Sequence, residues 1–433
     1  MIITKLNNYI FFLISSLFCL IIPALVSGPF LPDLFLSLIA IYGFSIMIIK
    51  KNYNILKHPF FIIFIFFYIY IFVNSLFSEN IKNSLSSSIF YFRYLFFIIG
   101  GIYLLEKNIK LIKYFLFIFS LTFIFVSFDA LYQLFYDFNL IGLEKQGDRL
   151  SGMFGEDELI LGSYLSRLFP LLIGIFIFIY KKPKNLIFYF LFLIFLTIID
   201  VLVFFSGERT AFFYITLSTI LMIFLLSNFK ILRIISLVLS FLIIISYGFY
   251  DNQMNNRMFT QTINDFGLKN LNEENLKLEI NENRDNRKIN AFSPKHEAMF
   301  ITSFNIFKDN IIFGKGPNSF EILCSDERFS VPNGCSTSPH NNFIQLLAET
   351  GLVGFTIVFC LFIYVTYVLT NHLYKKIFNK PGKLKDHEIC FYICILISLF
   401  PLVPTSNFFN NWLNVIYFLP LIFILKPRLY DNK

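Results

Sequence analysis

Long apolar segments recur along almost the whole chain, and they constrain its fold more than any other feature. Each is about 17 to 26 residues long, which suits a helix that crosses the hydrocarbon core of a bilayer. We count about twelve, at residues 9–26, 33–49, 59–77, 89–105, 111–136, 159–180, 186–205, 210–226, 231–250, 346–370, 389–405 and 410–425. With 56% hydrophobic and only 15% charged residues, the 433-residue chain is predicted to be an all-α polytopic membrane protein.

Positive charge is divided unequally between the connections. One alternating set is rich in Lys and Arg, at Lys50, Lys51, Lys57, Lys107, Lys110, Lys113, Lys181, Lys182, Lys184, Lys230, Arg233, Lys375, Lys376, Lys380, Lys383 and Lys385. The positive-inside rule then makes both termini cytoplasmic and places the connections 137–158, 206–209 and 251–345 outside. The net charge of +8 thus reflects short cytoplasmic loops and does not indicate nucleic-acid binding. The first span, after Lys5, is expected to be an uncleaved helix rather than a signal peptide.

The connection 251–345 is far longer than an ordinary loop and divides the chain. We expect membrane helices one to nine over 1–250, an external loop with a surface helix and a histidine motif over 251–345, and helices ten to twelve with a cytoplasmic tail over 346–433. Within the loop, Asn270 to Asn290 is expected to be loosely structured, 295–308 to be a helix along the membrane surface, and 314–318 to be a turn. Cys324 and Cys335 either form a disulfide or remain free, and the sequence leaves both options open.

Five charged residues interrupt the spans, and all are predicted to lie in their outer halves. A charge inside a bilayer is costly and marks either pairing or function. Pairing of Arg with Asp between helices is favoured for Asp129, Asp200 and Arg93, and a polar cavity open to the outer side explains the common depth of all five. The five residues are Arg93, Asp129, Arg167, Asp200 and Arg209.

The segment from Ser338 to Gly354 carries the strongest candidate for proton transfer. Pro339 suits the start of a helix, so His340 is expected in the first turn, at the outer mouth of span ten. The positive end of a helix disfavours imidazolium, so this side chain is expected to be neutral and able to accept a proton. A histidine that only caps the helix is the alternative.

Two further motifs place arginines at the same predicted depth. The turn from Ser206 to Thr210 joins spans seven and eight, and Arg209 beside a helix N-terminus has the chemistry of a phosphate site. Arg149 precedes span six in the sequence Asp148 to Gly155. The alternatives are an Arg209 that extends to interfacial water and an Arg149 in a solvated loop.

Taken together, these motifs resemble the O-antigen ligase and O-antigen polymerase (Wzy-type) superfamily of bacterial membrane glycosyltransferases. The resemblance rests on the following residues, in this order along the chain: Arg149, Gly152 and Phe154; Ser206 to Thr210; Gly314 and Gly316; His340, Asn341, Glu349 and Gly351. It implies a GT-C-type architecture, a large periplasmic loop between spans nine and ten, a glycan donor on undecaprenyl pyrophosphate, and no metal or other cofactor.

The resemblance also implies roles for individual residues. His340 would be the catalytic base, Arg209 the main pyrophosphate ligand, and Arg149 and Arg167 its helpers. Asn341, Glu349 and Glu208 would support the site. Glu208 departs from the small polar residue common in the family, and we expect it to pair with Arg209 or orient it. Lys295 and Met299 stand where family members often carry Arg and Trp.

The expected function is ligase-like transfer of the glycan to an acceptor, with lipid A–core favoured, at the periplasmic face of the bacterial inner membrane. The alternative is a polymerase that joins lipid-linked repeat units of O-antigen or exopolysaccharide. Protein O-glycosylation is a third possibility, although such enzymes tend to be longer. A polysaccharide transporter without chemistry should show internal repeats and midplane polar groups, which the sequence does not suggest.

Overall fold

The computed structural model describes residues 2–147, 149–155, 158–180, 185–248, 254, 256–260, 262–263 and 293–430. Several sequence-based predictions concern residues outside these ranges. They are the loose structure of the stretch from Asn270 to Asn290, the sidedness of Lys181, Lys182 and Lys184, and the first residue of the Asp148 to Gly155 motif.

Helices joined by short connections make up the described part of the chain, which contains no strand. The long helices are α1 (Ile2–Ala24), α2 (Phe30–Ile49), α3 (Pro59–Leu76), α5 (Arg93–Lys107), α6 (Leu111–Tyr136), α7 (Leu161–Tyr180), α8 (Leu186–Phe205), α9 (Arg209–Leu225), α10 (Lys230–Gly248), α15 (Asn342–Ile377), α16 (Asp386–Ser398) and α17 (Asn411–Tyr430). The remaining elements are η1 (Leu25–Ser27), η2 (Tyr53–Lys57), α4 (Ile81–Ser88), η3 (Gly152–Phe154), η4 (Asn256–Thr260), α13 (Pro294–Asp309) and α14 (Phe320–Leu323).

Each predicted span coincides with one of the long helices. Among the described residues, nine helices are long and apolar enough to cross a membrane. Helix α9 and the apolar part of α17 are shorter, and α16 has only 13 residues. The all-helical polytopic membrane fold is therefore confirmed, whereas the number of twelve spans stays a prediction.

The eleventh predicted span, 389–405, is too long at its outer end. Helix α16 ends at Ser398, and residues 399–410 form an irregular segment before α17. Pro401 and Pro404 explain this end, because proline lacks the backbone N–H that a helix needs and restricts the preceding residue. Non-helical backbone at membrane depth is tolerated where it lines a cavity, and this segment does so.

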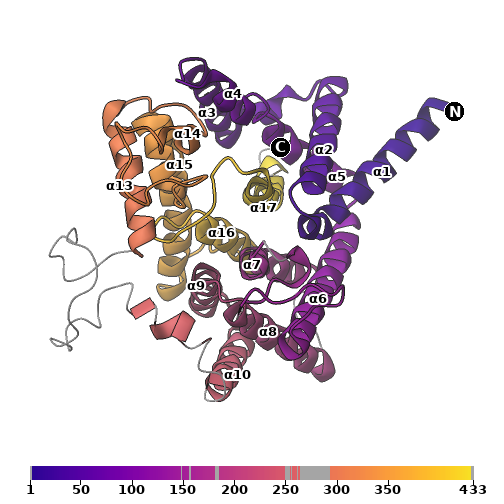
Figure 1. Ribbon diagram of the computed structural model, residues 1–433. Coiled ribbons are helices and arrows are strands. Elements are labelled where there is room, and N and C mark those ends of the chain that lie inside the picture. The colour runs from indigo at the N-terminus through magenta and orange to yellow at the C-terminus, as the bar shows by residue number, and fades with distance from the viewer. Residues whose placement is uncertain are drawn as a thin grey trace, which may run out of the picture.

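The helices are arranged around a buried centre. In Figure 1, α1 extends to one edge, α13, α14 and α15 lie at the opposite edge, and α17 lies near the middle. Helix α7 packs against α16, α9 and α6, and nearly all of its residues from Leu161 to Ile177 are buried. A helix that is apolar on every side belongs in the interior, so α7 is the central element on which the outer connections are built.

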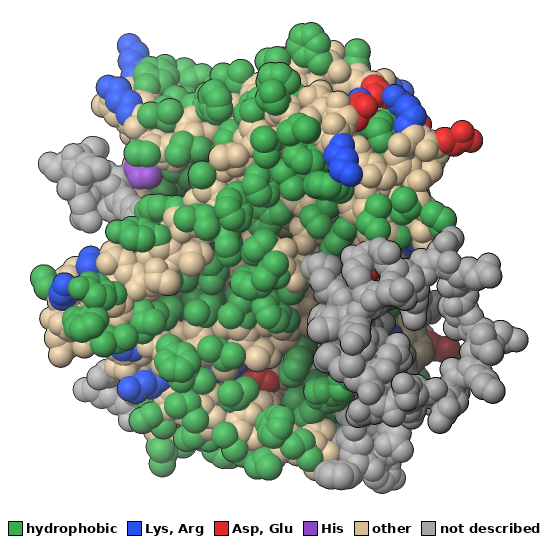
Figure 2. All heavy atoms as spheres, turned by 90° about the vertical axis from the view of Figure 1, so that its left-hand side faces the viewer, with side chains coloured by type: hydrophobic (Ala, Val, Ile, Leu, Met, Phe, Trp, Pro, Cys, Tyr) green, Lys and Arg blue, Asp and Glu red, His purple; other side chains and the backbone are tan. Residues whose placement is uncertain are grey.

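The outer faces of the peripheral helices are apolar. Large side chains such as Phe66, Phe117 and Tyr367 are more than half exposed. Figure 2 shows hydrophobic side chains across the middle of one face, with Lys and Arg mainly toward its left and right edges. An exposed apolar surface of this extent suits contact with lipid tails between two polar boundaries.

The predicted Arg–Asp pairing is confirmed for Asp200. Its partner is Arg233, a residue that the charge pattern places in a cytoplasmic connection. Asp200 of α8 makes a two-bond ion pair with Arg233, with both Nη–Oδ distances at 2.7 Å. Arg233 also donates to Thr219. The structure instead buries Arg233, at 3% exposure. Because the carboxylate turns toward the start of α10, Asp200 does not contribute to the outer cavity.

The other two favoured pairs have different outcomes. Arg93 pairs with Asp33 of α2 at 2.8 Å, which confirms pairing between helices. Pairing is wrong for Asp129, which contacts no Arg among the described residues. Its Oδ1 accepts the N–H of Leu140 at 3.0 Å instead. A buried carboxylate can be satisfied by backbone donors, so Asp129 fastens the connection that follows α6.

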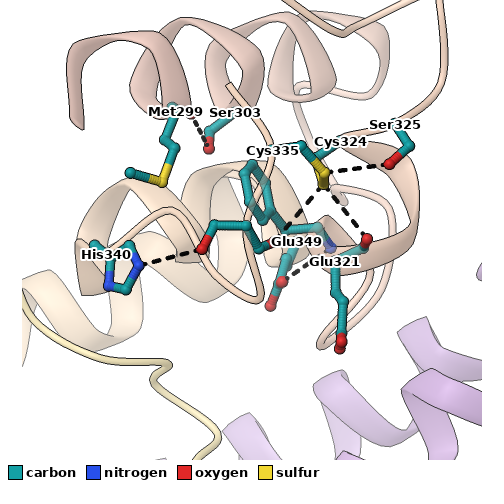
Figure 3. Close-up of a disulfide and its surroundings, with 10 residues drawn as sticks. Met299, Ser303, Glu321, Cys324, Ser325, Cys335, His340 and Glu349 are labelled. Atoms are coloured by element: carbon teal, nitrogen blue, oxygen red, sulfur yellow. Dashed lines mark hydrogen bonds between the residues drawn. A yellow bond between two sulfur atoms is a disulfide. The ribbon is translucent and has the colours of Figure 1, made fainter. Parts of the chain in front are cut away.

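Residues 293–341, the described C-terminal part of the long loop, form a small unit on α15. Helix α13 packs on α15, and both contact α14, around a separate apolar core that includes Met299, Ile306 and Phe320. The predicted helix over 295–308 is confirmed as α13. Cys324 and Cys335 are joined in a disulfide, with their Cα atoms 4.9 Å apart, so the open question about these thiols is settled (Figure 3).

Helices α2 and α5 approach each other more closely than ordinary side chains allow. A Cβ atom added to Gly43 would lie 2.6 Å from the backbone nitrogen of Gly100 and 2.8 Å from its Cα. Small residues at helix interfaces permit such backbone contact in membranes. This interface fixes α2 against α5, which carries Arg93 at its start.

Gly43→Leu should therefore destabilise the protein. Backbone atoms cannot rotate away from the added side chain, so we expect a loss of about 1–3 kcal/mol in the free energy of unfolding. Thermal unfolding in detergent would measure this loss. Ile41→Leu on the same helix is the matched control, because Ile41 is 62% exposed. Equal melting temperatures for the two variants would contradict the close α2–α5 contact.

Candidate active site

A cavity of about 910 Å³ opens at one end of the helices. It is lined by residues of the connections that were predicted to lie outside and by the adjoining irregular segments. The lining residues are 26–29, 149, 153–154, 158–160, 163, 167, 207–210, 213, 257, 262, 293, 296, 340, 402–406, 410 and 412–413. The common end of these connections is confirmed, while the compartment that they face stays a prediction.

Arg167 is the most deeply buried cation of the cavity. It is 2% exposed, and its guanidinium lies over the ring of Tyr214 at 4.5 Å. One Nη atom donates to the hydroxyls of Tyr214 at 3.1 Å and Thr405 at 3.0 Å. Within the described residues these partners are neutral, so the positive charge of Arg167 is available to an anion in the cavity.

Arg149 and Arg257 flank the turn between α8 and α9. Arg149 Nε donates to the carbonyl of Ser206 at 3.4 Å, and Arg257 Nε donates to the carbonyl of Gly207 at 3.1 Å. A Cβ on Gly207 would lie 2.9 Å from Arg149 and 3.0 Å from Arg257. Gly207 also has φ +66°, so both its backbone conformation and the lack of space require glycine.

The charges around this turn influence one another. Burial lowers the pKa of Arg149, and the neighbouring Arg257 and Arg209 lower it as well, whereas Glu208 raises it. Arg209 is the first residue of α9 and lines the cavity. The structure thus brings the three predicted arginines together and adds Arg257, which sequence analysis missed. Its only signal was its position just beyond the outer end of span nine.

Glu208 supports the site in a different way from the expected one. Its carboxylate accepts the N–H groups of Gly162 at 2.7 Å and Ser163 at 3.1 Å, and the hydroxyl of Ser163 at 2.6 Å. It therefore satisfies the N-terminal amides of α7, where negative charge is favourable. Burial raises the pKa of Glu208, and the bond from Ser163 and the charge of Arg149 oppose that rise.

His340 lies just before α15 rather than in its first turn. Asn341 is the N-cap, and its side chain accepts the N–H groups of Phe343 and Ile344. Asparagine caps a helix N-terminus well, so it fixes the start of α15 after both Pro339 and His340. His340 itself has φ +53°, a conformation that is uncommon outside glycine and is found at functional sites.

The surroundings of His340 keep its imidazole neutral near pH 7. Its Nε2 lies 3.3 Å from the hydroxyl of Ser336. Burial lowers the pKa of His340 below its usual value of 6.5, and the positive charge of Lys295 lowers it further. The cause is thus mainly burial, not the helix end invoked from the sequence.

Thr405 connects His340 with Arg167. Its backbone N–H donates to the carbonyl of His340 at 2.7 Å, and its hydroxyl accepts from Arg167 at 3.0 Å. Sequence analysis missed Thr405 because it assigned this position to a membrane helix. The irregular segment 399–410 therefore links the candidate base to the most buried cation.

Asn341 and Glu349 lie outside the cavity lining and hold the segments around it. Asn341 donates to the carbonyl of Pro401 at 2.7 Å. Glu349 accepts the N–H groups of Asn318 at 2.8 Å and Phe320 at 3.2 Å. The turn at 314–318 is thereby fixed on α15. Gly314 and Gly316 both have positive φ there, as the turn prediction implied.

A second histidine lines the cavity and was not recognised from the sequence. His296 of α13 lies in the lining together with Ser293. Its position directly after Lys295 was the available signal. Within the described residues, no group of three or more His, Cys, Asp and Glu is arranged to hold a metal ion.

The sequence of the region that carries this site matches a known family. Residues 192–359 match the family model described as O-antigen ligase. This match supports the resemblance of the chain to the O-antigen ligase and polymerase superfamily. The matched region contains Arg209, Arg257, His296 and His340, whereas Arg149, Arg167 and Thr405 lie outside it. No curated protein sequence matches the chain.

Glu208→Ala should destabilise the fold at this turn. It leaves two backbone donors of α7 without their acceptor, which costs about 1–3 kcal/mol. Glu208→Gln retains an acceptor oxygen and should lose less. Unfolding in detergent would compare the two variants. A melting temperature of Glu208→Ala equal to that of wild type would show that these bonds do not hold the turn.

Proposed function

We propose that this chain transfers a glycan from undecaprenyl pyrophosphate to an acceptor hydroxyl at the periplasmic face of the bacterial inner membrane. The superfamily assigns an O-antigen ligase or polymerase type of activity. The observation that carries the finer proposal is the cavity itself, which joins four arginines to a half-buried histidine.

The arginines match the leaving group. A lipid pyrophosphate carries negative charge that grows as the bond to the sugar breaks, and fixed cations stabilise that charge best. Arg167 and Arg149 are held by hydrogen bonds to neutral groups, and Arg209 begins α9, where helix amides favour an anion. The net positive lining thus provides a clamp without a metal ion.

His340 matches the acceptor side of the reaction. A neutral imidazole can take the proton from the acceptor hydroxyl, whose oxygen then bonds to the anomeric carbon. The bond from that carbon to the pyrophosphate oxygen breaks, and its electron pair leaves with undecaprenyl pyrophosphate. Lipid A–core is the favoured acceptor, so the proposed activity is that of a ligase.

The polymerase alternative uses the same chemistry with a second lipid-linked repeat unit as acceptor. A lipopolysaccharide gel of a deletion strain separates the two. Loss of long chains from lipid A with accumulated lipid-linked polymer would indicate a ligase, and core with a single repeat unit would indicate a polymerase. An unchanged ladder would contradict both lipopolysaccharide functions and favour exopolysaccharide, protein glycosylation or transport.

Arg209→Ala should weaken binding of the lipid pyrophosphate donor. A charged hydrogen bond contributes about 1.5–3 kcal/mol, so we expect a loss of roughly tenfold to hundredfold in affinity. Binding of undecaprenyl pyrophosphate to the detergent-solubilised protein would measure it. Arg328→Ala is the matched control, since Arg328 is an exposed arginine outside the cavity lining. If Arg209→Ala bound undecaprenyl pyrophosphate as tightly as the wild type, Arg209 would not be a pyrophosphate ligand.

The transfer rate should depend on the protonation of His340. Its pKa lies below 6.5, so the neutral base is present at neutral pH and is lost as the pH falls through that lowered value. We expect kcat to be constant above neutral pH and to decline as the pH falls through the lowered pKa of His340. His340→Ala should abolish this decline together with most activity. A decline with its midpoint above pH 6.5 would contradict a His340 base whose pKa is lowered.

A further inference from the structure

The end of the cavity that carries His340 holds a second imidazole. The ring centroids of His296 and His340 are 5.8 Å apart, with the ring planes nearly perpendicular at 86°. The two side chains come from α13 and from the residue before Asn341, and both line the same cavity. A group that binds His340 from the cavity is therefore within reach of His296.

The ring of His296 is fixed by an unusual use of a helix cap. Ser293 is the N-cap of α13, yet its side chain makes no capping bond to the helix backbone. Its hydroxyl instead lies 2.7 Å from Nδ1 of His296. Serine at an N-cap normally accepts a hydrogen bond from a free helix amide. Here its hydroxyl forms a hydrogen bond with the imidazole instead and orients the ring.

Simple packing does not account for this arrangement. The ring of Phe300 lies next to His296, with centroids 6.5 Å apart, and another phenylalanine would fill such a position without a hydrogen bond. Ser293 already forms a hydrogen bond with Nδ1. A hydrogen bond between His296 and a molecule in the cavity would therefore use Nε2. An imidazole held in this way can donate or accept one hydrogen bond.

We propose that His296 hydrogen-bonds the acceptor hydroxyl group that His340 deprotonates and holds its oxygen against the sugar. This inference rests on the proposed glycosyl transfer. In the step, His340 takes the hydroxyl proton, the acceptor oxygen bonds to the anomeric carbon, and the pyrophosphate leaves with the electron pair of the broken bond. His296 keeps its own proton and serves as a positioning residue that touches the acceptor.

The test is a kinetic comparison of wild type, His296→Ala and His296→Gln in detergent, with a synthetic undecaprenyl pyrophosphate glycan as donor and purified lipid A–core as acceptor. One hydrogen bond corresponds to roughly twofold to tenfold in affinity. We expect His296→Ala to raise the KM for the acceptor by about that factor, with the KM for the donor unchanged. His296→Gln keeps a side-chain donor and should recover part of the loss.

Phe304→Ala is the matched control for removal of a ring from α13. Phe304 is half exposed and lies outside the cavity lining, so its loss should leave both KM values unchanged. If His296→Ala raised neither KM, or raised only the KM for the donor, His296 would not contact the acceptor.

A double-mutant cycle with His340→Ala adds a second criterion. Two residues that act on one oxygen show non-additive effects, so His296→Ala should cost much less when His340 is already absent. Fully additive losses would overturn the proposal. A wild-type protein that transferred no glycan would instead overturn the proposed function, whereas an active wild type with an unaffected acceptor KM would overturn only the role of His296.

Discussion

Positive charge gathered out of water is the constraint on which the outer end of this protein depends. Arg209 and Arg257 lie close enough to Arg149 to lower its pKa, and Arg167 is almost fully buried. Like charges at short range repel strongly where water is scarce. The fold meets this cost with carbonyl and hydroxyl acceptors and with the carboxylate of Glu208, which compensates part of the charge and leaves the remainder for an anionic substrate.

The loops follow from this constraint. Glu208 cannot both neutralise Arg209 completely and satisfy the start of α7, and its hydrogen bonds go to α7. Gly207 has to be glycine because the side chains of Arg149 and Arg257 occupy the space that a Cβ atom would need. The unit that carries the disulfide then brings His340 and His296 to the same opening. The site is thus assembled from connections, while the helices provide a fixed frame in the apolar phase.

Sequence analysis predicted the helical frame well, because a membrane helix is recorded directly in a run of apolar residues. It also brought Arg149, Arg209 and His340 to one end. It failed where tertiary contacts decide the outcome. Asp200 of α8 pairs with Arg233 of α10, and α15 begins after His340 because Asn341 caps it. Residues 399–405 are not helical, and residues 402–405 line the cavity. Arg257, His296 and Thr405 were missed because their function depends on which segments meet, and that information is not local in the chain.

The position of Thr405 has a consequence for how this sequence could diverge during evolution. Its amide donates to the carbonyl of His340, and its hydroxyl accepts from Arg167. Thr405 therefore connects three segments that are far apart in the sequence, those of Arg167, His340 and Thr405 itself. A change in any one of them displaces the proton acceptor relative to the anion-binding charge. These three positions should therefore have drifted together during divergence, and a chimaera that exchanges only the C-terminal helices between distant relatives would inherit a mismatched connection even if every helix inserted correctly.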